Sequence, residues 1–447
     1  MKTNVAKVIE QARSSLWVLP LAITLAAALL AFALVELDRQ ERPADELLRL
    51  LPWVFEGGAE SARAVLTTIA GSMITLAGTV YSITIVALTL ASMQFAPRVL
   101  RGFMRDRGNQ VVLGFFVATF TYCLLVLRTV RSEEGVEFVP GRAVAGGLVL
   151  ALVSLGMLIY FIDHIFHGIQ ASSIINNVTN ETIAQINHLY PDTWTEGIPQ
   201  AGPLPGQPAQ RGETPDSWTP VPAGRSGYLQ YIDYEALFSL AVQADAVIKQ
   251  EHPNGSFVIE GGPLVYISPA SRLTPTLRKQ INGAFALGDH PTMQQDVAYG
   301  IRRLVDIALK AISPAVNDPT TALNCIDYLG SVLATLGNRK LPELDRADST
   351  GQVRLIVSER TFHDYVRLAF DQIRHYGAAD PLIGIRLLDT IGNTAQVIRN
   401  PANREVLCEH IQKIVSGAER TIADPNEREV VKRHAAAALA KVQSSHS

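Results

Sequence analysis

Four long stretches of the chain are apolar and contain no charged side chain. Residues 14–35, 64–97, 108–127 and 143–162 each lack Asp, Glu, Lys and Arg. Each reaches the roughly 20 residues that a helix needs to cross a hydrocarbon core about 30 Å thick. Because a helix satisfies its own backbone polar groups in lipid, we predict four transmembrane helices. They form a predicted transmembrane domain over residues 1–166.

The second apolar stretch differs from the others because it carries a stripe of hydroxyl groups. The hydroxyl residues lie on one predicted helix face, at steps of three and four: Thr68, Ser72, Thr75, Thr79, Ser82 and, after Val86, Thr89. Gly71 and Gly78 lie beside the stripe. A period of 3.5 residues keeps one face turned toward a neighbouring helix.

Two interpretations of the stripe stay open. In the first, it packs inside the four-helix unit, where small residues let backbones approach and hydroxyls bond carbonyls one turn back. In the second, helices from several subunits line a water-filled pore with rings of hydroxyls.

A short basic segment follows this helix. Between Pro97 and Gly108 the apolar residues share one face, and Arg98, Arg101 and Arg105 lie on the other. Pro favours the first turn of a helix and Gly favours its end, so we predict a short helix between them. We expect the arginines to contact anionic lipid headgroups. The alternative is a ring of arginines at the inner mouth of a pore, which would favour anions.

Basic residues also bear on orientation. Lys and Arg divide evenly between the two sides of the predicted helices, but they are denser on the side of the N-terminus. By the positive-inside rule, we predict that both termini are cytoplasmic.

Polar residues cluster at the end of the fourth apolar stretch. His164 and His167 are three residues apart, on one helix face, and Asp163 precedes them. A metal pair or a proton relay needs such spacing. Two histidines without a further fixed ligand are more often interfacial polar residues, so we predict no metal site.

The rest of the chain is predicted to be a soluble α+β domain. Residues 167–190 read as a neck helix, 191–227 as a Pro- and Gly-rich linker without regular structure, 228–290 as a small α/β module and 291–447 as a helical bundle. In the module we predict a strand at 228–232 and a helix at 234–249. Strands at 256–259 and 264–267 are predicted to form a hairpin through Gly261-Gly262.

In the bundle, a helix is predicted at 296–312, and Asp-Pro pairs at Asp318, Asp380 and Asp424 are expected to begin helices. Arg302 and Arg303 near a helix terminus are typical of an anion site, but a salt-bridged helix face is the more common case.

Composition narrows the function. The 447 residues are 48% hydrophobic and only 18% charged, with a net charge of −3 and three cysteines. These values exclude a secreted disulfide scaffold, and they do not favour nucleic-acid binding. The sequence lacks the common nucleotide, metalloprotease and hydrolase motifs. We therefore expect no enzyme activity, no catalytic residue and no cofactor.

Several long motifs resemble a bacterial family of predicted membrane proteins that is classified as a domain of unknown function. They lie at residues 68–75, 94–98, 103–110, 300–308 and 313–322. The resemblance extends over nearly the whole chain. It implies an integral protein of the inner membrane with a sizeable soluble part, and it supplies no activity, cofactor or catalytic residue.

Two classes of function follow. The first is an oligomeric ion channel or pore gated by its cytoplasmic domain. The second is a membrane-anchored sensor or scaffold, whose soluble helical domain binds a partner or small ligand without transport. In both, the expected partners are the lipid bilayer and further copies of the chain, with an ion or small cytoplasmic ligand, and not nucleic acid.

Overall fold

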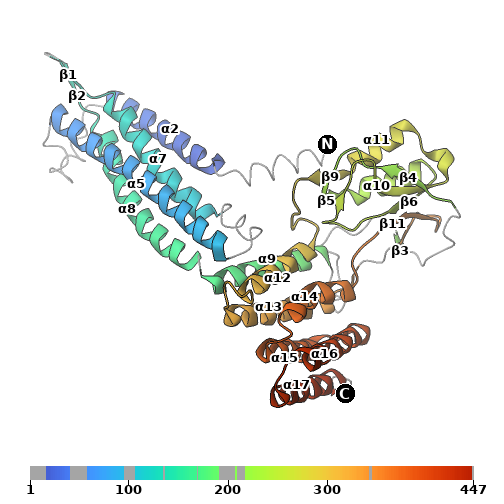
Figure 1. The fold of residues 1–447 in the computed structure, drawn as a ribbon. Helices are drawn as coiled ribbons and strands as arrows, with labels where there is room; N and C mark the ends of the chain where they lie inside the picture. The colour runs from blue at the N-terminus through green and yellow to red at the C-terminus, as the bar shows by residue number, and fades with distance from the viewer. Residues whose placement is uncertain are drawn as a thin grey trace. The chain divides into compact units, whose positions relative to one another are not determined.

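The computed structural model describes residues 17–40, 58–94, 106–133, 136–168, 170–190, 207–208, 217–341 and 345–444. Their contacts divide them into two compact units, one before and one after residue 170 (Figure 1). We call them the transmembrane unit and the soluble unit, and each is described by itself.

The transmembrane unit contains the four predicted helices. They are α2 (Val18–Gln40), α5 (Ala59–Gln94), α7 (Arg107–Leu127) and α8 (Gly141–Gly168). All four are long and apolar enough to cross a membrane, which confirms that prediction. Helix α7 packs against the other three and is the most buried of them. A small antiparallel hairpin, β1 (Arg131–Glu133) and β2 (Val136–Phe138), joins α7 to α8.

Polar contacts at the two ends of this unit fix the directions of the helices. At one end, the Asp38 carboxylate accepts hydrogen bonds from the N–H groups of Arg142 and Ala143, at the start of α8. Arg63, near the start of α5, donates to the Val130 carbonyl after α7.

At the other end of the unit, His164 of α8 pairs with Asp106, which caps the start of α7. The helices therefore alternate in direction, and α2 begins at the end where α8 finishes. Arg142 and His164 are 22 residues apart, a rise of about 33 Å. This matches a hydrocarbon core of about 30 Å.

The soluble unit contains two sheets. The larger has the strand order β3-β10-β11-β6-β8-β4, and the smaller has the order β7-β5-β9. The strands are β3 (Gln207–Pro208), β4 (Thr219–Pro222), β5 (Gly227–Ile232), β6 (Val247–Gln250), β7 (Phe257–Val258), β8 (Pro263–Ser268), β9 (Phe285–Gly288), β10 (Asp345–Ala347) and β11 (Val353–Ile356). Helices α10 (Tyr234–Gln243) and α11 (Pro275–Gly283) and the 3₁₀ turn η1 (Ala270–Arg272) complete this part, which we call the module.

The module corrects several predictions. The hairpin through Gly261-Gly262 is wrong, because β7 pairs with β5 while β8 pairs with β4 and β6. The helix from residue 234 ends at Gln243 rather than at 249, because Asp245 adopts a positive φ and the β-branched Val247 and Ile248 begin β6.

Two further segments contribute strands that the sequence pattern did not predict. Strand β4 and the short β3 lie in the stretch predicted to be a linker without structure. Strands β10 and β11 lie in the region predicted to be helical only. Strand β11 runs parallel to β6 and so brings residues from beyond α13 into the module's sheet.

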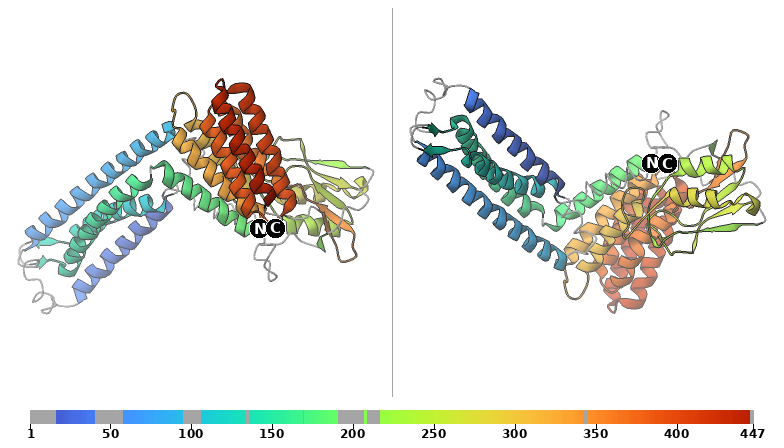
Figure 2. Two further views of the ribbon diagram at one scale, coloured as in Figure 1. Left: turned by 90° about the horizontal axis from the view of Figure 1, so that it is seen from below. Right: turned by 90° about the horizontal axis from the view of Figure 1, so that it is seen from above.

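The remaining helices form the bundle. They are α9 (Ala171–Leu189), α12 (Val297–Ala311), α13 (Pro319–Gly337), α14 (Phe362–Tyr376), α15 (Pro381–Val397), α16 (Pro401–Thr421) and α17 (Pro425–Ser444). Helix α9, which occupies the predicted neck, packs on α12 and α13. The orange to red helices α13, α15, α16 and α17 lie side by side (Figure 2).

Helix starts in the bundle follow the predicted Asp-Pro pattern. Asp318 and Asp380 accept hydrogen bonds from backbone N–H groups in the first turns of α13 and α15. Asp424 does the same for Asn426 in α17. Asn400 before Pro401 caps α16 in the same way, with Asn in place of Asp. The prediction of these starts is confirmed because capping depends only on neighbouring residues.

Candidate functional site

The hydroxyl stripe lies on the outer surface of α5. Its six hydroxyl residues are exposed in the single chain: Thr68, Ser72, Thr75, Thr79, Ser82 and Thr89. Each hydroxyl donates to the backbone carbonyl one turn back, at 2.8 to 3.0 Å. A hydroxyl that is bonded in this way has its proton satisfied without any neighbouring helix.

The opposite face of α5 packs into the transmembrane unit. That face is apolar and buried, and includes Leu66, Ile69, Met73, Ala77 and Val80. The interpretation that the hydroxyls pack inside the chain's own four-helix unit is therefore wrong. Packing against a second copy and lining a pore both stay predictions.

The exposed face of α5 also contains open space. Cβ atoms at Gly71 or Gly78 would meet nothing within 4 Å. Around the first of these glycines the surface forms a shallow hollow, lined by Thr67, Thr68, Gly71, Ser72, Thr75 and Leu76. Small residues at such a position let another helix approach closely.

The exposed faces of α2 and α8 have a different chemistry. They carry large apolar side chains: Leu21, Leu25, Leu29 and Phe32 on α2, and Leu152, Leu155, Ile159 and Ile162 on α8. Lipid tails favour such surfaces. The stripe on α5 is thus unlike these neighbouring outward surfaces.

Of the predicted basic helix, only the last residues, from Asp106 to Gly108, lie within the described part of the chain. Arg98, Arg101 and Arg105 lie outside the described residues. Gly108 does not end a helix as predicted, because it is in the first turn of α7, where the Asp106 carboxylate accepts its N–H. A Cβ at Gly108 would lie 2.7 Å from Nε2 of His164, so the close approach of that ring requires glycine.

The three polar residues at the end of α8 do not act together. His164 pairs with Asp106 and stacks on Tyr160. His167 instead contacts Asp163, one turn back on the exposed surface. Within the described ranges, no group of three His, Cys, Asp or Glu side chains is arranged to hold a metal ion.

A second candidate site lies in the soluble unit, where the module meets the bundle. The Tyr234 hydroxyl donates to Oε1 of Glu359 at 2.9 Å, and the Asn254 amide donates to the Tyr234 oxygen at 3.2 Å. Arg360 donates to the Asn254 carbonyl at 2.8 Å and to Oδ1 of Asp296 at 2.9 Å. We call these five residues the junction cluster.

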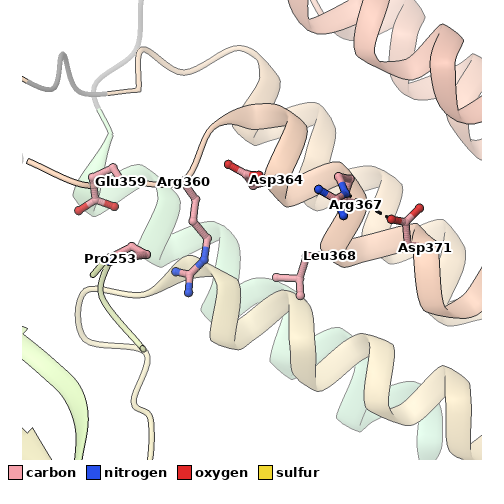
Figure 3. Close-up of a pocket in the computed structure, with 7 residues that line it drawn as sticks. All are labelled: Pro253, Glu359, Arg360, Asp364, Arg367, Leu368 and Asp371. Carbon is pink, nitrogen blue, oxygen red and sulfur yellow. Dashed lines mark hydrogen bonds and ion pairs between the residues drawn. The ribbon is translucent and has the colours of Figure 1, made fainter. Parts of the chain in front are cut away.

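The junction cluster borders a cavity of about 480 Å³. The cavity is lined by Pro253, Glu359, Arg360, Asp364, Arg367, Leu368 and Asp371 (Figure 3). Arg367 and Asp371 pair across one helical turn of α14, and Arg360 extends between α12 and the loop that carries Pro253. The lining contains three carboxylates and two guanidinium groups, so it suits neither a simple anion nor a simple cation.

Two carboxylates of the cluster have raised pKa values. Burial raises the pKa of Asp296 to about 6, against the opposing effect of the Arg360 guanidinium. The Glu359 side chain is partly exposed where it lines the cavity. Its carboxylate is nevertheless largely removed from water, and this desolvation raises its pKa to about 7. The Tyr234 hydrogen bond and Arg360 oppose this shift, while the Asp296 charge adds to it.

The sequence pattern does not reveal this cluster. It indicates Arg302 and Arg303 instead, as an anion site or a salt-bridged helix face, and the structure shows the second: Arg303 pairs with Glu181 of α9, and Arg302 donates to Gln372 of α14. The junction residues come from separate positions along the chain, and the local signals among them are the Asn254-Gly255 turn before β7 and Asp296 at the start of α12.

Comparisons with known proteins give a family and no activity. Residues 13–393 match the profile of a family described as "Predicted membrane protein (DUF2254)". The chain is similar to the uncharacterized protein Rv1290c of Mycobacterium tuberculosis and to the uncharacterized protein Mb1321c of Mycobacterium bovis. Each is 35% identical over 399 residues, which cover 87% of this chain and 74% of the relative. No solved structure matches the chain.

Proposed function

The chain belongs to the DUF2254 family of predicted membrane proteins, and we propose that it forms an oligomeric ion channel whose pore is lined by α5. One observation carries the proposal: the hydroxyl and glycine face of α5 points away from its own four-helix unit. The exposed faces of α2 and α8 carry large apolar side chains that suit lipid. Helix α5 also exposes apolar side chains, such as Ile74 and Val86, but of these three helices it presents the row of exposed hydroxyls, which suits another copy or water.

The stripe is long enough to line most of a bilayer. From Thr68 to Ser82 the helix rises about 21 Å, and on to Thr89 about 32 Å. Copies of α5 arranged around an axis would place hydroxyl oxygens at successive levels along the pore. Hydroxyl rings present acceptors without a net charge, so this pore would not select ions by charge at these levels.

We propose the following setting for the channel. It is a homo-oligomer in the inner membrane, with both termini cytoplasmic and with anionic headgroups around its basic residues. The four spans among the described residues alternate in direction, with α2 beginning where α8 ends, and this supports placing both termini on one side. The net charge of −3 argues against nucleic acid as a partner. We propose no enzyme activity, since the sequence has no catalytic motif.

The alternative is a membrane-anchored sensor or scaffold without transport. The cavity beside the junction cluster favours it, because a small cytoplasmic ligand could bind there and change the packing of module and bundle. The same cavity would serve to gate a channel, so transport distinguishes the two functions and ligand binding does not.

Cysteine substitution at Thr79 tests where the stripe faces. The background is Cys408→Ser, because Cys123 and Cys325 are buried and Cys408 is partly exposed. In membranes, Thr79→Cys is expected to crosslink between subunits or to react with a water-soluble thiol reagent.

Ile159→Cys is the matched control for this experiment. Ile159 is 66% exposed on α8, and it lies 17 residues from Arg142, as Thr79 lies 16 residues from Arg63 at the same end of the unit. It is expected to react only with a lipid-soluble reagent. The same lipid-only pattern at Thr79 would contradict the proposal.

A further inference from the structure

Glu359 occupies a connection between two parts of the soluble unit. It follows β11 of the module's sheet and precedes α14 of the bundle, so the backbone passes from one part to the other at this residue. Its hydrogen-bond donor Tyr234 belongs to the module, on α10. We propose that Glu359 is a proton-dependent latch: the protonated side chain holds the module against the bundle, and its ionisation loosens this junction.

The contacts around Glu359 leave its charge poorly compensated. Arg360 is the adjacent cation, but its guanidinium donates to Asp296 and to the Asn254 carbonyl. The side-chain donor to Glu359 is the neutral Tyr234 hydroxyl, and the Arg360 backbone N–H donates to the same carboxylate. An ionised carboxylate that is largely surrounded by protein and lacks a dedicated cation is destabilised relative to its neutral form.

The surrounding groups also include more acceptors than donors. Gln250 is 1% exposed and Asn254 is 2% exposed. Among the described residues, neither Oε1 of Gln250 nor Oδ1 of Asn254 has a hydrogen-bond donor. Gln250 donates to the carbonyl of Ser358, next to Glu359. A protonated Glu359 would add one O–H donor to this acceptor-rich region.

Titratable and charged groups face Glu359 from each element packed around it. They are Tyr234 of α10, Tyr190 at the end of α9, Tyr365 of α14, Asp296 before α12, and Arg360, Asp364 and Arg367 around the cavity. The Tyr190 and Tyr365 hydroxyls bond each other at 3.1 Å, and burial raises the pKa of both, so they stay neutral. Asp296 is the other carboxylate in this group whose pKa burial raises toward neutral.

The direction of the pH effect follows from these shifts. The pKa of Glu359 is about 7 in the folded protein, against an ordinary value of 4.5. Between these values the folded state binds more protons than the unfolded state, so stability falls as pH rises. The latch is therefore closed on the acid side of neutral pH, and it opens as pH rises through about 7. This inference does not depend on the proposed pore.

Amide hydrogen exchange of the full chain in detergent tests the latch. After correction for intrinsic exchange, we expect wild-type segments 247–258 and 357–366 to exchange at least tenfold faster at pH 8.5 than at pH 5.5, with a midpoint near 7. A pKa difference of one unit corresponds to a tenfold change in equilibrium. Glu359→Gln, which stays neutral, is expected to remove the pH dependence. Glu260→Gln, at an exposed carboxylate elsewhere in the module, is expected to leave it unchanged.

A second variant keeps the test decisive if Glu359→Gln does not fold. The Tyr234 hydrogen bond stabilises the ionised form, so Tyr234→Phe is expected to move the midpoint to higher pH. A flat wild-type profile would overturn the proposal. A midpoint near 7 that survives Glu359→Gln, or that does not move in Tyr234→Phe, would assign the transition to another group and would equally overturn it.

Discussion

The serine and threonine hydroxyls on α5 find their hydrogen-bond acceptors within their own helix. Because each stripe hydroxyl bonds a carbonyl of its own helix, the residue type alone is compatible with lipid, protein or water. The glycines add to this only in combination with the hydroxyls. Gly71 and Gly78 leave open space beside the stripe, but the exposed Gly156 on α8 does the same without a row of hydroxyls. The case for a protein or water neighbour therefore depends on the hydroxyls and glycines together.

Gly255 and Gly261 allow backbone strain to be separated from steric overlap. Both have a positive φ, of 80° and 81°. A Cβ at Gly255 would overlap the Asp296 carboxylate, whereas one at Gly261 would meet nothing within 4 Å. We expect Gly261→Ala to lower the free energy of unfolding by roughly 1–2 kcal/mol, from strain alone. Gly255→Ala should lose roughly 1–3 kcal/mol more, from overpacking.

Thermal unfolding of the two variants in detergent checks this prediction. The Gly255→Ala variant is also expected to disturb the Arg360–Asp296 pair, since the added methyl group displaces the carboxylate. Equal losses in the two variants would show that Asp296 moves away without an energetic cost. That result would contradict close packing of Gly255 against the Asp296 carboxylate.

At the scale of elements, α7 and α8 are joined by polar contacts in an apolar setting. The hydroxyls of Thr119 and Ser154 are both buried and lie 3.0 Å apart. Tyr122 also donates to the Ala143 carbonyl, at 2.7 Å. Hydrogen bonds of this kind hold transmembrane helices together where the hydrophobic effect cannot.

A double-mutant cycle measures the Thr119–Ser154 contact. We expect Thr119→Val and Ser154→Ala to be coupled by about 0.6 kcal/mol, the average found for such bonds in membranes. The stability of the single and double variants is measured by thermal unfolding in one detergent. The pair Thr68→Val and Ser154→Ala is the control, because Thr68 bonds only its own helix and should show additive effects. Additive effects at Thr119 and Ser154 would contradict the contact.

The elements that depend on local sequence were predicted well. The four apolar stretches became four helices, and Asp318, Asp380 and Asp424 begin helices as expected. The helices follow from long apolar segments, and the helix starts follow from two or three neighbouring residues. Strand partners were not predictable in this way, since β11 reaches β6 across about a hundred residues of chain. The expected hairpin between residues 256–259 and 264–267 does not form, because β7 pairs with β5 and β8 pairs with β6 and β4.

The candidate sites show the same limit. The stripe was visible because its spacing lies within one helix, but the sequence could not tell which way that face points. The junction cluster was not visible. Asn254, Asp296 and Glu359 are far apart in sequence, and they meet only because the module's sheet takes a strand from beyond α13.

At the scale of the whole molecule, the length of α5 sets it apart. Its 36 residues rise about 54 Å, well beyond a hydrocarbon core of about 30 Å. Counted from Arg63, a rise of about 33 Å ends near Ile85, so Thr89 lies at or beyond the far boundary of the membrane. Thr75, Thr79 and Ser82 lie inside it. If α5 lines a pore, substitutions at these three residues are therefore expected to have the largest effect on conduction.

Ion flux through proteoliposomes tests the central claim most directly. We expect the wild-type protein to pass ions and Thr79→Leu to abolish this flux, because a ring of leucines blocks conduction by dewetting. The Thr79→Leu oligomer should keep its size on a sizing column, since a water-filled pore has room for the side chain. In a tight packing interface the same substitution would cost roughly 1–3 kcal/mol, and the oligomer would loosen. Leu155→Phe, on the exposed face of α8, should alter neither property. Wild-type liposomes that pass no ion at any tested voltage, tension or pH would contradict the channel and leave the anchored sensor or scaffold.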